Sequence, residues 1–307
     1  MLKRILLSAF ALAIMLPAFA QHKRRVLVEE FSNATSPPCF TQNLTFNAVI
    51  ASNIDYLTPV RYQTDWPFAD PMNAQNPNDV DARVNYYNII SVPNCRQLGT
   101  LEVFPLTNYT PGIIEAGYNN LTPVTMTLTH KISPNRDSIY LHVSVTSDAA
   151  LTGNLRLRVA VTEEEILFPV PPTSHSGEKE FFQVMRKMLP DAHGTATGDF
   201  AAAETKSYDF AWKIGYAYDL NKLSAAAWLQ NDDTREVYQS AHSLPLGGIP
   251  YLGISIPPMN KFNCIAGASP QFDLTNTAPA NLTTALLKYR IDGGAWANYT
   301  VDGFNPP

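Results

Sequence analysis

The most reactive side chains of this 307-residue sequence belong to three cysteines, Cys39, Cys95 and Cys264. A cysteine attacks disulfides as its thiolate, so its reactivity depends on its pKa and its exposure. Cys39 ends the segment Ser36-Pro37-Pro38-Cys39 at the start of a helix predicted from Pro37 to about Ser52. A helix N-terminus lowers the pKa of a thiol through its dipole and its free N–H groups. Thiol chemistry at this helix start is therefore the first hypothesis to test.

The N-terminus has the pattern of a cleavable secretory signal peptide. Lys3 and Arg4 form a positive n-region, Ile5 to Leu16 an apolar h-region, and Ala18-Phe19-Ala20 the small-x-small site that a signal peptidase cuts. We therefore expect residues 1–20 to be removed. An exported protein meets an oxidising compartment, and an odd number of cysteines means that at least one stays unpaired or pairs outside the chain.

Charge and hydropathy exclude two classes of protein for the mature chain. Removing the signal peptide takes away two of the 22 basic residues and no acidic one, so the formal net charge goes from −5 to −7. That balance gives no basic surface for nucleic acid. Charged residues interrupt every later apolar run before it reaches the roughly 20 residues of a membrane-spanning helix. We expect a soluble exported protein that is not membrane-spanning and binds no nucleic acid.

Two kinds of hydrophobic periodicity divide the mature chain. Residues 21–120 mix strand-like and helical patterns, which predicts an α/β domain with a last helix near Pro111–Asn119. From Thr122 onward, apolar and polar residues alternate at period two, which predicts an immunoglobulin-like, all-β sandwich over residues 121–255. Residues 256–307 are expected to form a linker and a partial third β domain, either packed on the sandwich or part of an incomplete gene product.

Three further segments carry polar groups without a clear chemical pattern. The excursion Phe168–Gly198 within the sandwich is expected to be a surface loop with one or two helical turns. Glu163-Glu164-Glu165 is expected to be the solvated end of a strand. Asp65 and Asp70 lie in a loop rich in proline and asparagine, where we expect them to fix turns.

The order of elements around Cys39 resembles the thioredoxin fold. A strand ends at Phe31, the segment Ser36-Pro37-Pro38-Cys39 starts a helix, and Val92-Pro93 follows a later helix, as the Cys-x-x-Cys motif and the cis-proline loop do in that family. The resemblance places Ser36 where the attacking cysteine stands and Cys39 where its buried partner stands. A serine hydroxyl forms no disulfide, so this motif cannot run a dithiol cycle. We therefore expect no catalytic residue.

The thioredoxin resemblance leaves two roles open for Cys39. Cys39 is either an inert core residue or the partner of Cys95 in a disulfide, because the cis-proline loop of the fold lies against the start of the active-site helix. The alternative function is a thiol-dependent oxidoreductase or chaperone that uses Cys39 or Cys95. His175 and His193 lack the spacing of metal ligands, and we expect neither a metal ion nor a cofactor.

Longer motifs resemble the Omp twenty-eight family of outer-membrane-associated proteins, namely Val26–Phe31, Phe181–Pro190 and Ala227–Gln239. That family joins a thioredoxin-like domain to a β-sandwich. The resemblance implies an exported protein of the periplasm, the outer membrane or the extracellular space. These motifs specify a lineage and not a reaction. Because Ser36 replaces the attacking cysteine, we expect a non-catalytic role, with a redox-dead thioredoxin-like domain and a β-sandwich as binding or scaffold modules for an unknown protein or envelope partner.

Overall fold

The computed structural model describes residues 21–245, 252–255, 273–276, 284–289 and 297–302. The chain divides into two compact units, Met1–Gly247 and Gly248–Pro307. The second unit contains two antiparallel strand pairs, β13 (Leu252–Ser255) with β14 (Asp273–Asn276) and β15 (Thr284–Tyr289) with β16 (Ala297–Asp302). The predicted signal peptide, Cys264 and the start of the predicted linker lie outside the described residues.

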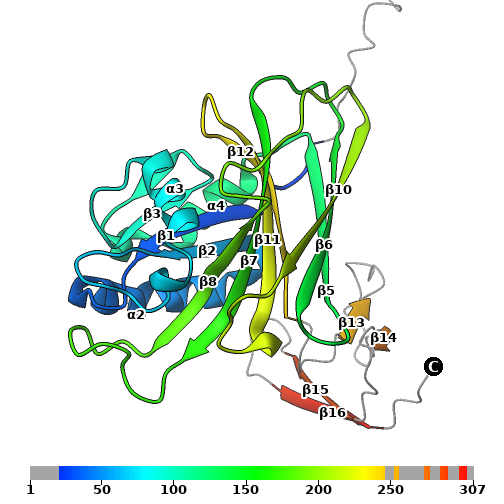
Figure 1. Cartoon of the computed structure of the whole chain (residues 1–307). Helices are drawn as coiled ribbons and strands as arrows, with labels where there is room; N and C mark the ends of the chain where they lie inside the picture. Colours follow the sequence, from blue (N-terminus) through cyan, green and yellow to red (C-terminus); the bar gives the residue numbers. More distant parts are fainter. Residues whose placement is uncertain (1–20, 246–251, 256–272, 277–283, 290–296, 303–307) are drawn as a thin grey trace, which may run out of the picture. The chain divides into compact units, whose positions relative to one another are not determined.

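One nine-stranded sheet runs through the first unit in the order β12-β11-β7-β8-β2-β1-β3-β4, with β9 paired to β7 (Figure 1). β1 and β2 are parallel, β1 and β3 are antiparallel, and Arg61 of β2 pairs with Val184 of β8. Residues 21–120 and 121–245 therefore share a sheet, and a domain boundary at 120 stays a prediction. The strands are β1 (Val26–Ser32), β2 (Leu57–Gln63), β3 (Asn94–Gln97), β4 (Leu101–Val103), β7 (Leu155–Leu167), β8 (Glu180–Leu189), β9 (Thr195–Ala196), β11 (Leu223–Asn231) and β12 (Val237–Ser243).

Helices cover both faces of the sheet around β1. Successive strand residues point to opposite faces of a sheet. One helix donates from Asn43 to Ser32 of β1, whereas another donates from Arg83 to Glu29 of the same strand, so these two helices lie on opposite faces. Each α-helix begins with a proline, whose fixed φ and missing N–H suit a first turn. The helices are α2 (Pro37–Ser52), α3 (Pro77–Tyr87) and α4 (Pro111–Asn119), with 3-10 turns η1 (Ile54–Tyr56), η2 (Asn73–Gln75), η3 (Leu106–Asn108) and η4 (Leu220–Lys222).

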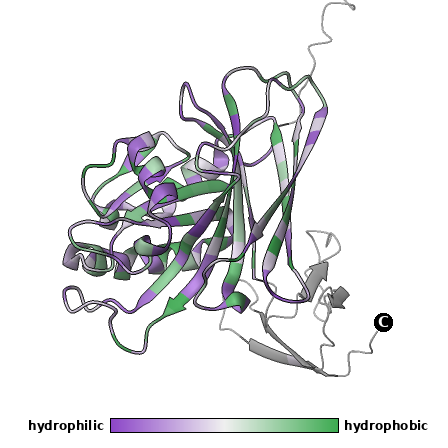
Figure 2. Ribbon diagram, viewed as in Figure 1, coloured by the Kyte–Doolittle hydropathy of each residue, from purple (hydrophilic) through white to green (hydrophobic). Residues whose placement is uncertain are grey.

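A second, three-stranded sheet packs against part of the large one. Its order is β10-β6-β5, with β5 (Val124–Ile132), β6 (Ser138–Ser147) and β10 (Glu204–Lys213). Val143 of β6, Val159 of β7 and Ala227 of β11 belong to the core between the two layers. Hydrophobic residues, green in Figure 2, run along the strands of both sheets. The period-two pattern thus marks antiparallel strands with one face in this core.

The predicted surface excursion at Phe168–Gly198 is wrong, because this segment contains β8 in the interior of the large sheet. Met185 of β8 packs in the core around β1, whereas Phe181 and Val184 pack with Met72 in a separate cluster. A strand buried on both faces shows no polar alternation. The sequence pattern of β8 therefore lacks the period-two signal that marks the other strands.

The predicted solvated run Glu163-Glu164-Glu165 is also wrong in its first two positions. Glu163 is fully buried in β7, and its carboxylate lies 3.4 Å from Nε of Arg186. Glu164 pairs with Nε2 of His242 at 2.7 Å. Partners on other strands compensate these two buried charges, and that pairing is not visible in the local sequence.

A buried hydrogen-bond network joins the α/β part to the sandwich strands. Glu29 of β1 accepts from Nη2 of Arg83 at 2.7 Å and from the hydroxyls of Tyr62 at 2.9 Å and Tyr87 at 2.5 Å. The amide of Gln230 on β11 donates to the Tyr87 hydroxyl at 3.1 Å. These contacts fix β1 and α3 against the sandwich.

Candidate functional site

Ser36 serves as the N-cap of α2. Its side-chain oxygen accepts from the backbone N–H of Cys39 at 3.3 Å, and its carbonyl accepts from that of Phe40 at 3.1 Å. Serine is a preferred N-cap residue, because its oxygen satisfies a free N–H group of the first turn. Pro37 and Pro38 are exposed on the first turn, whereas Ser36 is buried. The residue at the predicted attacking position therefore stabilises a helix and presents no thiol.

Both described cysteines are buried and free. Burial raises the pKa of the Cys39 thiol to about 11, although hydrogen bonds from Ser36 and Ser32 lower it. Burial raises the pKa of the Cys95 thiol well above its ordinary value, and the nearby Glu30 carboxylate raises it further. Neither thiol is in a setting that favours the reactive thiolate.

The disulfide considered between Cys39 and Cys95 is not formed in this structure. Cys95 lies on β3 opposite Glu30 of β1, whereas Cys39 lies on the first turn of α2 beside Ser32 and Ser36. The Glu30 carboxylate raises the pKa of both thiols, so this charged group is a neighbour of each. The Val92–Pro93 peptide bond is cis and leads directly into β3.

A buried ion pair lies next to the two thiols. Glu30 of β1 and Nη1 of Arg61 on β2 are 3.0 Å apart, and both side chains are almost fully buried. Burial raises the pKa of Glu30, whereas Arg61 and a hydrogen bond from Ser32 lower it. This pair was not predicted from the sequence as a site feature. Adjacent glutamates in an otherwise apolar strand were the signal that could have indicated it.

Hydrogen bonds from a neighbouring loop hold the turn before α2 in place. Asp70 accepts from the backbone N–H groups of Ala34 at 2.6 Å and Met72 at 2.8 Å. The Asn33 amide donates to the carbonyls of Thr64 at 2.7 Å and Phe68 at 3.0 Å. Asp70 thus fixes a turn, as predicted. The segment from Asn33 to Ser36 is rigidly supported.

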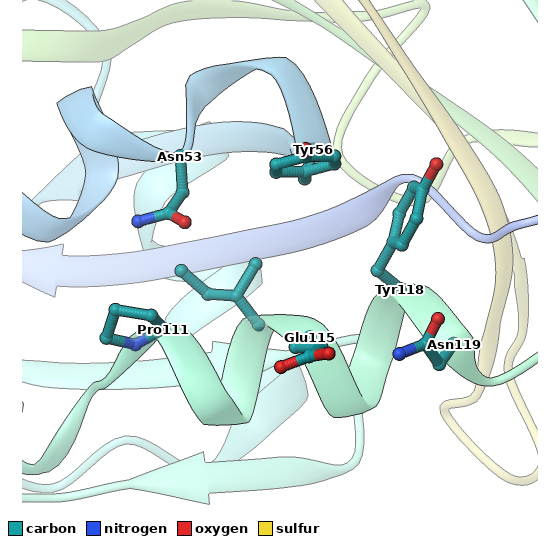
Figure 3. Close-up of a pocket in the computed structure, with 7 residues that line it drawn as sticks. Asn53, Tyr56, Pro111, Glu115, Tyr118 and Asn119 are labelled. Carbon is teal, nitrogen blue, oxygen red and sulfur yellow. The ribbon is translucent and has the colours of Figure 1, made fainter. Parts of the chain in front are cut away.

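Two cavities flank α2, one near each end of the helix. Near its C-terminal end, a cavity of about 310 Å³ lies between η1 and α4, and Figure 3 shows Tyr56, Tyr118, Asn53 and Asn119 around it. The two tyrosine rings pack edge to face with centroids 4.9 Å apart, and the Asn53 amide donates to the carbonyl of Val49. The polar and aromatic groups of this cavity are therefore largely occupied by contacts within the chain.

The second cavity, of about 200 Å³, lies beside the first half of α2. Phe40, Asn43 and Asn47 of the helix line one side, and Glu178 and Phe182 line the other. Phe40 directly follows Cys39, so this cavity lies next to the Ser36–Cys39 turn at the start of α2. Burial raises the pKa of Glu178 to about 7, although a hydrogen bond from Asn43 lowers it. This cavity was not predicted from the sequence, because the helix and the β8 segment are far apart in the chain.

The described part of the chain contains neither a candidate metal site nor a candidate membrane-spanning helix. No group of three or more histidine, cysteine, aspartate or glutamate residues there could hold a metal ion. No described helix is both long enough and apolar enough to cross a membrane.

Solved structures show where this fold has been seen before. No family model matches the chain, and no curated protein matches it. The structure of HBP35 of Porphyromonas gingivalis is similar with a TM-score of 0.61 and 14% sequence identity, over 92% of this chain and 99% of that chain. This likeness shows a shared fold, a mixed α/β arrangement with a large sheet and few helices.

Two further structures have lower similarity scores. A protein from Agrobacterium tumefaciens is similar with a TM-score of 0.47 and 14% identity, over 73% of this chain and 96% of that chain. A domain of the outer membrane lipoprotein Omp28 from Porphyromonas gingivalis has a TM-score of 0.27 and 14% identity, over 40% of this chain and 88% of that chain.

Proposed function

We propose that this chain is an exported envelope protein in which a redox-dead thioredoxin-like domain and a β-sandwich act as binding or scaffold modules. The signal peptide pattern of residues 1–20 supports export. The motifs Val26–Phe31, Phe181–Pro190 and Ala227–Gln239, which resemble the Omp twenty-eight family, support a place in the periplasm, at the outer membrane or outside the cell. The partner is a protein or another envelope component.

The non-catalytic role rests on the burial of Cys39 and on the raised pKa of its thiol. A thiol with a pKa of about 11 is ionised in roughly one molecule in ten thousand at pH 7. The side chain is also fully buried, so the few thiolates that form cannot reach a disulfide in solution. Ser36 stands at the first position of the motif, where its hydroxyl caps the helix and supplies no thiol. The arrangement argues against thiol exchange.

Insulin reduction and thiol labelling of the mature protein test this proposal. We expect no insulin reduction above the dithiothreitol background, and we expect Cys39 and Cys95 to react with a maleimide only after denaturation. Ser36→Cys is the matched variant, because it places a thiol at the same helix N-terminus. We expect that new thiol to label faster than Cys39 in the native state. Rapid native labelling of the wild-type thiols, or insulin reduction at the rate of a dithiol enzyme, would support the thiol-dependent alternative instead.

A further inference from the structure

The cavity between η1 and α4 combines an exposed aromatic ring with polar groups that a ligand can reach. One side is lined by Glu115, Tyr118 and Asn119, whose spacing along α4 places them on one face of the helix. Across the cavity from that face lie Asn53 and Tyr56 (Figure 3). At about 310 Å³, the cavity is at the lower end of the roughly 300–1,000 Å³ of small-molecule sites. It therefore suits a small ligand.

The Tyr56 ring offers an apolar platform to such a ligand. Tyr56 is 45% exposed, and Figure 3 shows its ring edge-on, with one face turned toward α4 across the cavity. The face of an aromatic ring carries partial negative charge, so it attracts C–H groups, which carry partial positive charge. The rings of Tyr56 and Tyr118 touch edge to face, which leaves no slot between them for a proline ring. The platform therefore favours a ligand with a flat face of C–H groups over a proline-rich peptide.

The polar groups around this platform supply both donors and acceptors that solvent reaches. The Glu115 side chain is exposed, and its carboxylate has no hydrogen bond or ion pair with the described residues. The Asn53 amide nitrogen donates to the carbonyl of Val49, which leaves its oxygen as an acceptor that is open to solvent. Exposed Asn119 accepts from the Lys23 ammonium with its oxygen, which leaves its amide nitrogen as a donor. A ligand in the cavity can contact all three side chains.

The charges around the cavity balance. The negative groups are Glu115 on α4 and Asp55, which precedes Tyr56 on η1. The positive groups are Lys23, whose ammonium lies 5.5 Å from the centroid of a lining tyrosine ring, and Arg25, whose guanidinium donates to the carbonyl of Asp55. A charged ligand would be attracted by one pair and repelled by the other. The cavity therefore favours a neutral ligand.

We propose that this cavity binds a neutral pyranose sugar of an envelope glycan. A sugar hydroxyl both donates and accepts, so hydroxyls pair with the Glu115 carboxylate, the Asn53 oxygen and the Asn119 amide N–H. The C–H face of the sugar ring packs on the exposed ring of Tyr56. The inference rests on the proposed binding role and names the chemical class of the envelope component.

An NMR titration of the mature protein with maltose and with cellobiose tests the proposal. With at least one of them, we expect saturable shifts of the side-chain amide signals of Asn53 and Asn119, independent of salt concentration because the ligand is neutral. Tetramethylammonium and a polyproline peptide should bind more weakly than that sugar. No shift with either sugar, or tighter binding of the cation or the peptide, would overturn the proposal. Binding of soluble starch or hydroxyethyl cellulose as well supports a glycan, whereas binding of the disaccharide alone would replace the glycan with a free sugar.

Variants of the cavity wall sharpen this test. Tyr56→Ala removes the platform and should weaken sugar binding roughly tenfold. Tyr140→Ala is the matched control, because Tyr140 is 42% exposed but lies on β6 and does not line the cavity, so binding should not change. Glu115→Gln, at an exposed position of α4, keeps an acceptor and should weaken sugar binding only a few-fold. Unchanged binding in Tyr56→Ala, an equal loss in Tyr140→Ala, or complete loss in Glu115→Gln would overturn the proposal.

Thiol labelling of the same wild-type sample separates this inference from the proposed function. Inert thiols with no sugar binding overturn the sugar site alone. Reactive thiols together with sugar binding overturn the non-catalytic role and leave the sugar site standing.

Discussion

Two adjacent glutamates of β1 are both fully buried beside an arginine, yet their pairing differs. Glu29 has its charge distributed over good hydrogen bonds, at 2.7 Å from Arg83, 2.9 Å from Tyr62 and 2.5 Å from Tyr87. Hydrogen bonds to an ionised group are among the strongest in proteins, and three of them offset much of the cost of burying a carboxylate. The Glu29 carboxylate is therefore well satisfied.

Glu30 points to the opposite face of β1, where the pairing is incomplete. It lies 3.0 Å from Arg61 and has one further partner, the Ser32 hydroxyl, so it has fewer partners than Glu29. Cys39 and Glu178 lie on the same side of the sheet as Glu30. The pKa of Glu178 is raised to about 7. Incompletely paired buried groups tend to mark functional sites, whereas fully paired networks stabilise the fold. We therefore expect the ion pair on the face of α3 to contribute more to stability than the ion pair on the face of α2.

The largest expected effect comes from removing the arginine partner of Glu29. Arg83→Met leaves a buried carboxylate short of its main donor, which should lower the free energy of unfolding by about 3–5 kcal/mol. Arg61→Met is the matched variant on the other face. Its loss should be smaller, because burial already raises the pKa of Glu30, and the carboxyl can take up a proton when Arg61 is removed. Urea unfolding followed by circular dichroism measures both.

Equal losses in Arg83→Met and Arg61→Met would break the comparison. They would mean that the two ion pairs stabilise the fold alike in spite of their different hydrogen bonding. A larger loss in Arg61→Met would mean that the Glu30–Arg61 pair, on the face of α2, stabilises the fold more than the Glu29–Arg83 pair does.

The sequence predicted local elements better than it predicted the partners of charged groups. Helices Pro37–Ser52 and Pro111–Asn119 agree with the structure because a proline at the first turn and the helical spacing of apolar residues are local signals. The central strand β8 was missed because both of its faces are buried. Glu178 was missed because its partner Asn43 is 135 residues away, and such a contact is set by the fold.

The next effect in size is a pH dependence of stability due to Glu178. Its pKa is about 7 in the folded protein and about 4.3 in the unfolded chain, so the folded state holds the proton more tightly. Stability from this group is complete below the unfolded pKa and is lost as the pH rises through the folded pKa. The expected loss between pH 4.5 and 7.5 is about 3 kcal/mol. Urea unfolding at a series of pH values measures it.

Glu178→Gln is the control for this pH dependence, because glutamine does not titrate. The difference in unfolding free energy between the two proteins should change with pH. The wild type should become less stable relative to the variant as the pH rises. A constant difference from pH 4.5 to 7.5 would contradict the raised pKa of Glu178.

The smallest effect concerns Ser36, the N-cap on the incompletely paired face. Ser36→Ala removes the acceptor for the Cys39 N–H and should cost about 1 kcal/mol of unfolding free energy. The control is Ser52→Ala at the exposed end of the same helix, where a change within about 0.5 kcal/mol is expected. Loss of the cap should also increase local opening of the first turn, so Cys39 should react faster with a maleimide under native conditions. If Ser36→Ala lowers stability while leaving the labelling rate of Cys39 unchanged, then the side chains packed on the thiol, and not the cap, keep it closed.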